Sequence, residues 1–110
     1  MLIDFKAIEE VRLPGFRGGE KDTIARLFTD DLSNRIMYGK LEPGASIGYH
    51  KHENDSEMIY ILHGKGKALY EDGEEALTAG VCHYCPKDHS HSLINNSDED
   101  LIFFAVVAHQ

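Results

Sequence analysis

The sequence predicts an all-β protein, built as an antiparallel sandwich or barrel. About nine or ten short apolar, β-prone stretches follow one another, turn residues separate them at close intervals, and a helical pattern is nearly absent. At 110 residues and 42% hydrophobic, the chain can bury one sizeable core but not two. We therefore expect a single domain over residues 1–110.

The amino-terminal part gives the weakest structural signals. Residues 2–5 are compatible with a short strand, and residues 5–11 form the one plausible helical patch. Pro14-Gly15 would end that patch before a second turn. Residues 15–22 combine three glycines with charged side chains and are typical of a mobile loop.

The rest of the chain is expected to consist of strands. They are residues 23–28, 35–41, 46–52, 57–62, 66–71, 74–78, 81–85, 90–95 and 101–107. A polar cluster at residues 30–34 predicts the turn between the first two. Asp72-Gly73 is the strongest two-residue hairpin signal in the chain.

Charge and hydropathy exclude several classes of partner. The net charge of −8 and the pI near 5.2 oppose binding to the phosphates of nucleic acids and to acidic membranes. The first ten residues carry four charges and lack the apolar run of a signal peptide. The longest apolar run, residues 101–108, is too short to cross a bilayer as a helix. A cytoplasmic location is the expectation.

The two cysteines have a Cys-x-x-Cys spacing that could indicate a redox or zinc motif. Cys82 and Cys85 lie in a stretch that is predicted to be a strand, so their side chains should leave from opposite faces, about 10 Å apart. This geometry does not permit a disulfide. We expect two small, reduced and mostly buried thiols.

Three residues within a short stretch point to a metal site. In an extended strand, His50 and His52 leave from the same face, about 7 Å apart. A polar turn follows, and the chain reversal could bring Glu57 beside both imidazoles, whereas Glu53 should point the opposite way. Two imidazoles and a carboxylate suit a divalent ion such as Mn, Fe, Co, Ni, Cu or Zn. The alternative is that His50, His52 and Glu57 are surface polar residues in a loop, because an isolated His-x-His is a weak signal.

Two motifs in the sequence resemble those of the cupin family. The first is Gly44-x5-His50-x-His52-x4-Glu57-x6-Gly64, over residues 44–64. The second is Gly80-x5-Pro86-x-Asp88-x2-His91-x3-Asn95, over residues 80–95. Asp88 replaces the glycine that the family has after the proline. Aspartate tolerates turn and left-handed conformations, so the tight turn can survive this change.

The resemblance implies a double-stranded β-helix, that is, a mostly antiparallel jelly-roll barrel. It also implies that His91 completes a ligand set with His50, His52 and Glu57, with His89 as the local rival. Three neutral imidazoles and one carboxylate would leave a dication with net positive charge and about two open positions in octahedral geometry.

Strand parity predicts an apolar wall around this site. Residues expected to share a face with the ligands are Ile59, Ile61, Leu93 and Asn95. Cationic side chains that could anchor a substrate carboxylate are Arg26, Arg35, Lys40 and Lys51, and the sequence does not choose among them. The sequence identifies no catalytic acid or base.

The resemblance implies a small metal-dependent enzyme acting on an oxygen-rich organic molecule, of dioxygenase, decarboxylase, lyase or isomerase type. The alternative is a non-catalytic module that binds a metal and a small ligand, and a purely structural barrel is a third possibility. The apolar run at residues 101–107 has bulky side chains at both parities, so both of its faces should be covered. Small cupins of this kind form homodimers, which is the expectation here.

Overall fold

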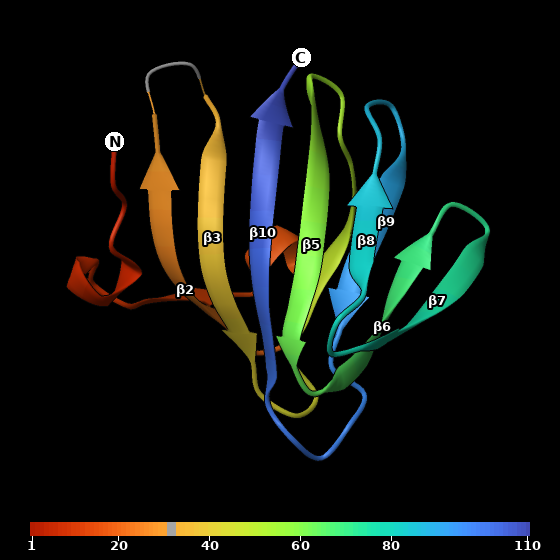
Figure 1. The fold of residues 1–110 in the computed structure, drawn as a ribbon. Helices are drawn as coiled ribbons and strands as arrows, with labels where there is room; N and C mark the ends of the chain where they lie inside the picture. Colours follow the sequence, from red (N-terminus) through yellow and green to blue (C-terminus); the bar gives the residue numbers. More distant parts are fainter. Residues whose placement is uncertain (31–32) are drawn as a thin grey trace.

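Two antiparallel β-sheets face each other in the computed structural model, which describes residues 1–30 and 33–110. The larger sheet has six strands in the order β1-β2-β3-β10-β5-β8, and the smaller has four in the order β4-β9-β6-β7. In Figure 1, β2, β3, β10, β5 and β8 lie side by side across the front, with β9, β6 and β7 to one side. The all-β prediction is confirmed.

The described elements are short strands and two 3-10 turns. The strands are β1 (Val11–Pro14), β2 (Asp22–Thr29), β3 (Arg35–Leu41), β4 (Ser46–Lys51), β5 (Asp55–His63), β6 (Lys65–Tyr70), β7 (Gly73–Thr78), β8 (Cys82–Cys85), β9 (Ser90–Ile94) and β10 (Leu101–His109). The 3-10 turns are η1 (Phe5–Ala7) and η2 (Phe16–Gly18).

The amino-terminal predictions need correction. Residues 2–5 form no strand, and the helical patch shrinks to the single turn η1, which Asp4 caps by accepting a hydrogen bond from the Lys6 backbone. Strand β1, which has four residues and pairs with β2, has no counterpart among the predicted strands. A strand this short owes its conformation to pairing with a distant segment, which local sequence does not report.

The hairpin between β6 and β7 is present, but its turn lies one residue earlier than predicted. Tyr70 pairs with Gly73, so the loop residues are Glu71 and Asp72. Glu71 takes a left-handed backbone conformation (φ 51°) and exchanges hydrogen bonds with the backbone of Ser90 on both its N–H and its carboxylate. These contacts fix the turn at Glu71. The turn predicted at 30–34 includes residues 31 and 32, which lie outside the described residues.

An apolar core fills the space between the sheets. Its members are the inward residues of both sheets: Leu41, Ala45, Ile47, Ile59, Ile61, Ala68, Leu77, Leu93, Leu101, Phe103 and Ala105. Strand β10 supplies alternate residues to this core, as a half-buried strand should. Asn95 is fully buried and donates hydrogen bonds to the carbonyls of Leu41 and Glu99, so it ties loops together at the end of the core.

A β-bulge in β4 sets the direction of the first motif histidine. Ile47 pairs with Leu93 of β9, but His50 pairs with His91, so β4 contains one extra residue between these pairs. The bulge lets Ile47 and His50 face inward although they are three residues apart. Without it, His50 would point to the opposite side of the sheet.

The turns that flank the two motifs have the conformations that the motif residues suggest. Gly44, Gly64 and Gly80 all have positive φ angles, which glycine adopts without steric cost. Asp88 has a φ of 71°, so the aspartate in the second motif does take the left-handed conformation. The substitution at this position therefore leaves the turn intact.

A tight strap covers the edge strand β4. Residues 15–19, here called the strap, include η2. The residue that follows the strap, Glu20, accepts a hydrogen bond from the Ser46 N–H at the start of β4. A Cβ atom at Gly48 would overlap the backbone of Arg17, and one at Gly19 would overlap that of Ser46. The segment that the sequence indicated as a mobile loop is therefore packed closely against β4.

The two cysteines are free thiols in β8 and differ in exposure. Cys85 is buried, and burial raises its thiol pKa to about 12. Cys82 is exposed, which corrects the expectation that both would be buried. In the part of the chain that the structure describes, no helix combines the length and the hydropathy needed to cross a bilayer.

Candidate metal centre

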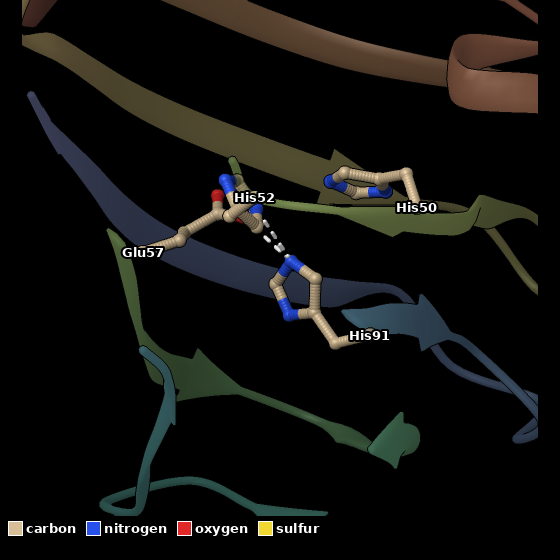
Figure 2. Close-up of side chains that lie close together, drawn as sticks. All are labelled: His50, His52, Glu57 and His91. Atoms are coloured by element: carbon tan, nitrogen blue, oxygen red, sulfur yellow. Dashed lines mark hydrogen bonds and ion pairs between the residues drawn. The ribbon is translucent and has the colours of Figure 1, made fainter. Parts of the chain in front are cut away.

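Four side chains from both sheets converge at one end of the barrel. His50 belongs to β4, His52 follows directly after β4, Glu57 lies near the start of β5 and His91 near the start of β9. One donor atom of each lies within 4.8 Å of the donors of the other three (Figure 2). The structure thus brings together the four residues that the sequence analysis selected. His89 stays apart, with its side chain 44% exposed and 3.9 Å from Glu71.

The distances inside this cluster suit a single small cation. The Nε2 atoms of His52 and His91 are 2.9 Å apart, and the Glu57 carboxylate lies 3.2 Å from the first and 3.0 Å from the second. Neighbouring ligands of an octahedral ion with bonds of about 2.1 Å are separated by about 3.0 Å. The observed spacings therefore match adjacent coordination positions.

Hydrogen bonds to the Nδ1 atoms orient the imidazoles for metal binding. His50 donates through Nδ1 to the Gly48 carbonyl (2.7 Å), and His52 donates through Nδ1 to Asp55 (2.5 Å). In a neutral imidazole, each of these bonds would leave the Nε2 lone pair available to a metal on the side of the cluster. Such partners behind metal-binding histidines fix the tautomer and raise the basicity of the ligand.

Glu57 and the imidazoles perturb one another strongly. Burial alone would raise the pKa of Glu57, but hydrogen bonds from His52 and His91 outweigh it and lower the pKa to about 2. Burial would lower the pKa of His52, yet Glu57 and Asp55 raise it overall. Burial lowers the pKa of His50, and the neighbouring imidazoles lower it further. The carboxylate is thus ionised at neutral pH, as a metal ligand must be.

A cavity of about 130 Å³ opens beside the cluster. His50, His52 and Glu57 form its polar side, while apolar side chains form most of the wall: Phe16, Leu27, Met37, Ile47, Ala105 and Val107. Two guanidinium groups, those of Arg17 and Arg35, complete the lining. The cavity can therefore hold a small molecule whose anionic groups lie beside the guanidinium groups and the cluster.

Arg35 is connected to the cluster through one carboxylate. Asp55 accepts the hydrogen bond of His52 on one oxygen and lies 3.4 Å from the Arg35 guanidinium with the other. One acidic residue therefore orients both a candidate metal ligand and a cation of the cavity wall. Of the four predicted anchors, Arg35 is the one on this cavity, whereas Arg26 and Lys40 line a separate hollow near Glu10.

The predicted pocket wall is apolar, as expected, but it is built from other residues. Ile59, Ile61 and Leu93 share a face with the ligands yet lie deeper, in the closed core, and Asn95 holds loops together. The wall comes instead from β2, β3, β4, β10 and the strap. The alternation of side chains along each strand predicted correctly which residues face inward. It does not indicate how deep in the barrel each of them lies.

Two residues near the site were missed by the sequence analysis. Arg17 reaches the cavity because it adopts a left-handed conformation (φ 56°) within the strap, which no local pattern indicates. His83 lies behind His91, with its Nε2 atom 2.9 Å from Nδ1 of His91. It pairs with Ile59, a residue predicted to face inward, but this pairing is a property of the sheet that no local sequence pattern indicates.

The sequence and the fold both have recognisable relatives. Residues 37–107 match the cupin domain family. The oxalate-binding protein of Thermotoga maritima is 33% identical over 117 residues, which cover 97% of this chain and 93% of that protein. The crystal structure of a predicted oxalate decarboxylase from the same organism superposes with a TM-score of 0.89 at 29% identity, over the full length of both chains.

More distant structures share the fold alone. A sugar phosphate isomerase of the cupin superfamily from Silicibacter pomeroyi has a TM-score of 0.79 at 21% identity, covering 100% of this chain and 76% of that one. The cupin domain of Cnp3 from Schizosaccharomyces pombe has a TM-score of 0.75 at 15% identity, covering 80% and 61%. These likenesses confirm the jelly-roll barrel that the two motifs predicted.

Proposed function

Because the chain belongs to the cupin family, we propose that His50, His52, Glu57 and His91 bind a divalent transition metal and that a small carboxylate binds to this metal in the adjacent cavity. The convergence of four donors, three of which line a cavity, carries the proposal. The ion would be Mn, Fe, Co, Ni, Cu or Zn, since imidazole and carboxylate ligands accept all of these. When bound, it would act as a Lewis acid toward ligand oxygens.

Charge supports a carboxylate ligand. A dication with one carboxylate and three neutral imidazoles has a net positive charge, and the cavity wall adds Arg17 and Arg35. Guanidinium groups pair well with carboxylates because their donors match both oxygens. The relative from Thermotoga maritima that is named an oxalate-binding protein makes oxalate the first ligand to test.

The metal site is tested by elemental analysis of protein purified without a metal-affinity tag. We expect close to one transition-metal ion per chain in the wild type and background levels in His52→Ala, because the variant loses a central donor. His89→Ala is the matched control, since His89 lies two residues from His91 but outside the cluster. A wild-type protein that binds none of these metals, even after their addition, would contradict the proposal.

The ligand is tested by calorimetric titration of oxalate into metal-loaded and metal-stripped protein. We expect binding to the loaded form only, and weaker binding to loaded Arg35→Met, which keeps a long apolar chain but loses the guanidinium. Oxalate affinity that does not depend on the metal would contradict the proposed site.

Binding without turnover is the function that the cavity supports best. Among the described residues that line it, the ionisable groups other than the two guanidinium groups are His50, His52 and Glu57. All three are members of the donor set, so none of them remains as a separate acid or base. A decarboxylase is the second candidate, supported by the likeness to the predicted oxalate decarboxylase. Release of carbon dioxide from oxalate by metal-loaded protein would favour the enzyme over the binding module.

We further propose that the protein forms a homodimer. The outer face of the larger sheet carries a group of apolar and aromatic side chains, here called the outer patch: Tyr38, Met58, Tyr60, Tyr84, Phe104 and Val106. Its three tyrosines are 40–51% exposed. A second copy is the proposed occupant, because two strongly acidic chains repel each other least where they meet through an uncharged surface. The expected cytoplasmic location stays a prediction, and the free thiols are in keeping with it.

A further inference from the structure

His83 is a buried histidine that none of the proposed ligand contacts uses. It lies in β8 of the larger sheet with no exposed side-chain surface. Its ring lies nearly parallel to that of His91, with an interplanar angle of 21° and centroids 5.1 Å apart. Its Nε2 atom is 2.9 Å from Nδ1 of His91, the ring nitrogen that faces away from the cluster.

The other nitrogen of His83 contacts a carboxylate at the protein surface. Glu75 lies in β7, the edge strand of the smaller sheet, and its side chain is 47% exposed. Its carboxylate oxygen is 2.7 Å from Nδ1 of His83. Hydrogen bonds therefore run without interruption from a surface carboxylate, through one buried imidazole, to a candidate metal ligand.

A bound metal would fix every proton in this chain of hydrogen bonds. A cation among the donors requires the Nε2 lone pair of His91, so the ring proton must be on Nδ1. His91 then donates to Nε2 of His83, which has to accept. The proton of His83 is consequently on Nδ1, where it is donated to Glu75, and the carboxylate is the natural end point of the series.

We propose that His83 and Glu75 are positioning residues that hold His91 in its metal-binding tautomer and orientation, an inference that rests on the proposed metal site. Neither residue contacts the cation or the cavity. Asp55 has the same role behind His52, where one hydrogen bond joins the carboxylate to the candidate ligand. Behind His91, two hydrogen bonds in series join the ligand to Glu75 through His83. The negative charge of Glu75 makes the His91 ring a stronger donor, as partners behind metal-binding histidines do.

The sharpest test changes Glu75, because an exposed position on an edge strand can be altered without disturbing the core. Substitutions behind metal-ligating histidines typically weaken metal affinity by about 10- to 100-fold. For Glu75→Ala we expect about tenfold weaker binding of Zn²⁺ or Co²⁺ in competition with a chelator. Glu75→Gln should lie between this variant and the wild type, because its amide oxygen still accepts the proton of His83.

Glu74→Ala is the matched control. Glu74 is the neighbouring residue of β7, is 62% exposed and pairs with Lys67 at the surface, so its removal changes the net charge equally without touching His83. We expect wild-type metal affinity for this variant. An equal loss of affinity in Glu74→Ala and Glu75→Ala would overturn the proposal, because a general charge effect would then explain both.

A spectroscopic measurement separates positioning from stability. In Zn²⁺-loaded protein the Nδ1 proton of His91 should give a hydrogen-bonded imidazole signal that exchanges slowly with water. Replacement of His83 by Phe, which fills the same space without accepting a proton, should remove this slow exchange and weaken binding at least tenfold. Retention of the slow signal and of wild-type affinity in both His83→Phe and Glu75→Ala would overturn the positioning role alone. Failure of the wild type to bind any metal would overturn the metal site, and the positioning role with it.

Discussion

Glu57 is the residue on which the electrostatics of the site depend. It is almost completely buried, and two imidazoles donate hydrogen bonds to its carboxylate. These bonds more than offset the unfavourable burial of a charge, so the pKa falls to about 2. In the metal-free protein, the charged group between His52 and His91 is therefore the Glu57 carboxylate.

The low pKa of Glu57 predicts an acid-sensitive contribution to stability in metal-free protein. A carboxyl group whose folded-state pKa lies below its unfolded value of 4.5 stabilises the fold above that pH. The contribution should disappear as the pH falls from 4.5 toward 2. Thermal unfolding of metal-stripped protein measures it, and Glu57→Gln should show a flatter decline over the same range. Parallel curves for both proteins would contradict the assigned pKa.

An individual site residue could be predicted when the residues that position it lie close to it in the sequence. His50, His52 and Glu57 lie close in sequence, so strand parity and one turn brought them together. His91 needed the resemblance of the second motif. His83 could not be identified, because its role follows from the pairing of β8 with β5, which local spacing does not encode.

At the scale of elements, the strap and the bulged strand β4 form one unit. The bulge turns His50 inward, and the strap seals the outer edge of the same strand while placing Arg17 on the cavity. The strap can approach β4 closely because residue 48 is a glycine. A Cβ atom at this position would overlap the backbone of Arg17.

Gly48→Ala should therefore loosen the strap. We expect a loss of about 1–3 kcal/mol in the free energy of unfolding, which is typical of overpacking, and faster trypsin cleavage within residues 15–22. Gly73→Ala is the control, because a Cβ at Gly73 meets only ordinary contact at 3.8 Å and should change stability by about 0.5 kcal/mol or less. Unchanged unfolding and proteolysis in Gly48→Ala would show that the packing of the strap against β4 is not tight.

Elements could be predicted where their pattern was long and regular. The strands from β2 onward appear within a few residues of their predicted bounds, because alternation and turn residues are local signals. The amino-terminal region was predicted wrongly. Its conformation depends on η1 capping, on pairing between β1 and β2 and on contacts of the strap with β4, and two of these three act over long distances.

At the scale of the whole molecule, the outer patch lies on the face of the larger sheet opposite the core. Part of this face is covered from within the chain, since Phe5 packs edge-on against Phe104 and lies 6.4 Å from Tyr38. The remainder, around Tyr60 and Tyr84, is exposed. A contiguous apolar surface of this kind is typical of a protein interface.

Sedimentation should show a dimer at micromolar concentration. Tyr60→Asp would place a charge in the outer patch of each subunit and should shift the protein to monomer. Tyr49→Asp is the control, because Tyr49 is 51% exposed, against 44% for Tyr60, but belongs to β4 of the smaller sheet. A monomeric wild type would contradict the predicted dimer, and a dimeric Tyr60→Asp variant would exclude this face as the interface.

The four candidate ligands do not belong to one sheet. Glu57 extends from the larger sheet, while His50 and His91 extend from the smaller one. An ion coordinated by all of them would connect the two sheets directly, at the edge of the apolar core. Hydrophobic packing would then hold the two sheets together in the core, and coordination bonds would hold them together at the donor cluster. Occupancy of the metal site would therefore govern how freely the two sheets separate.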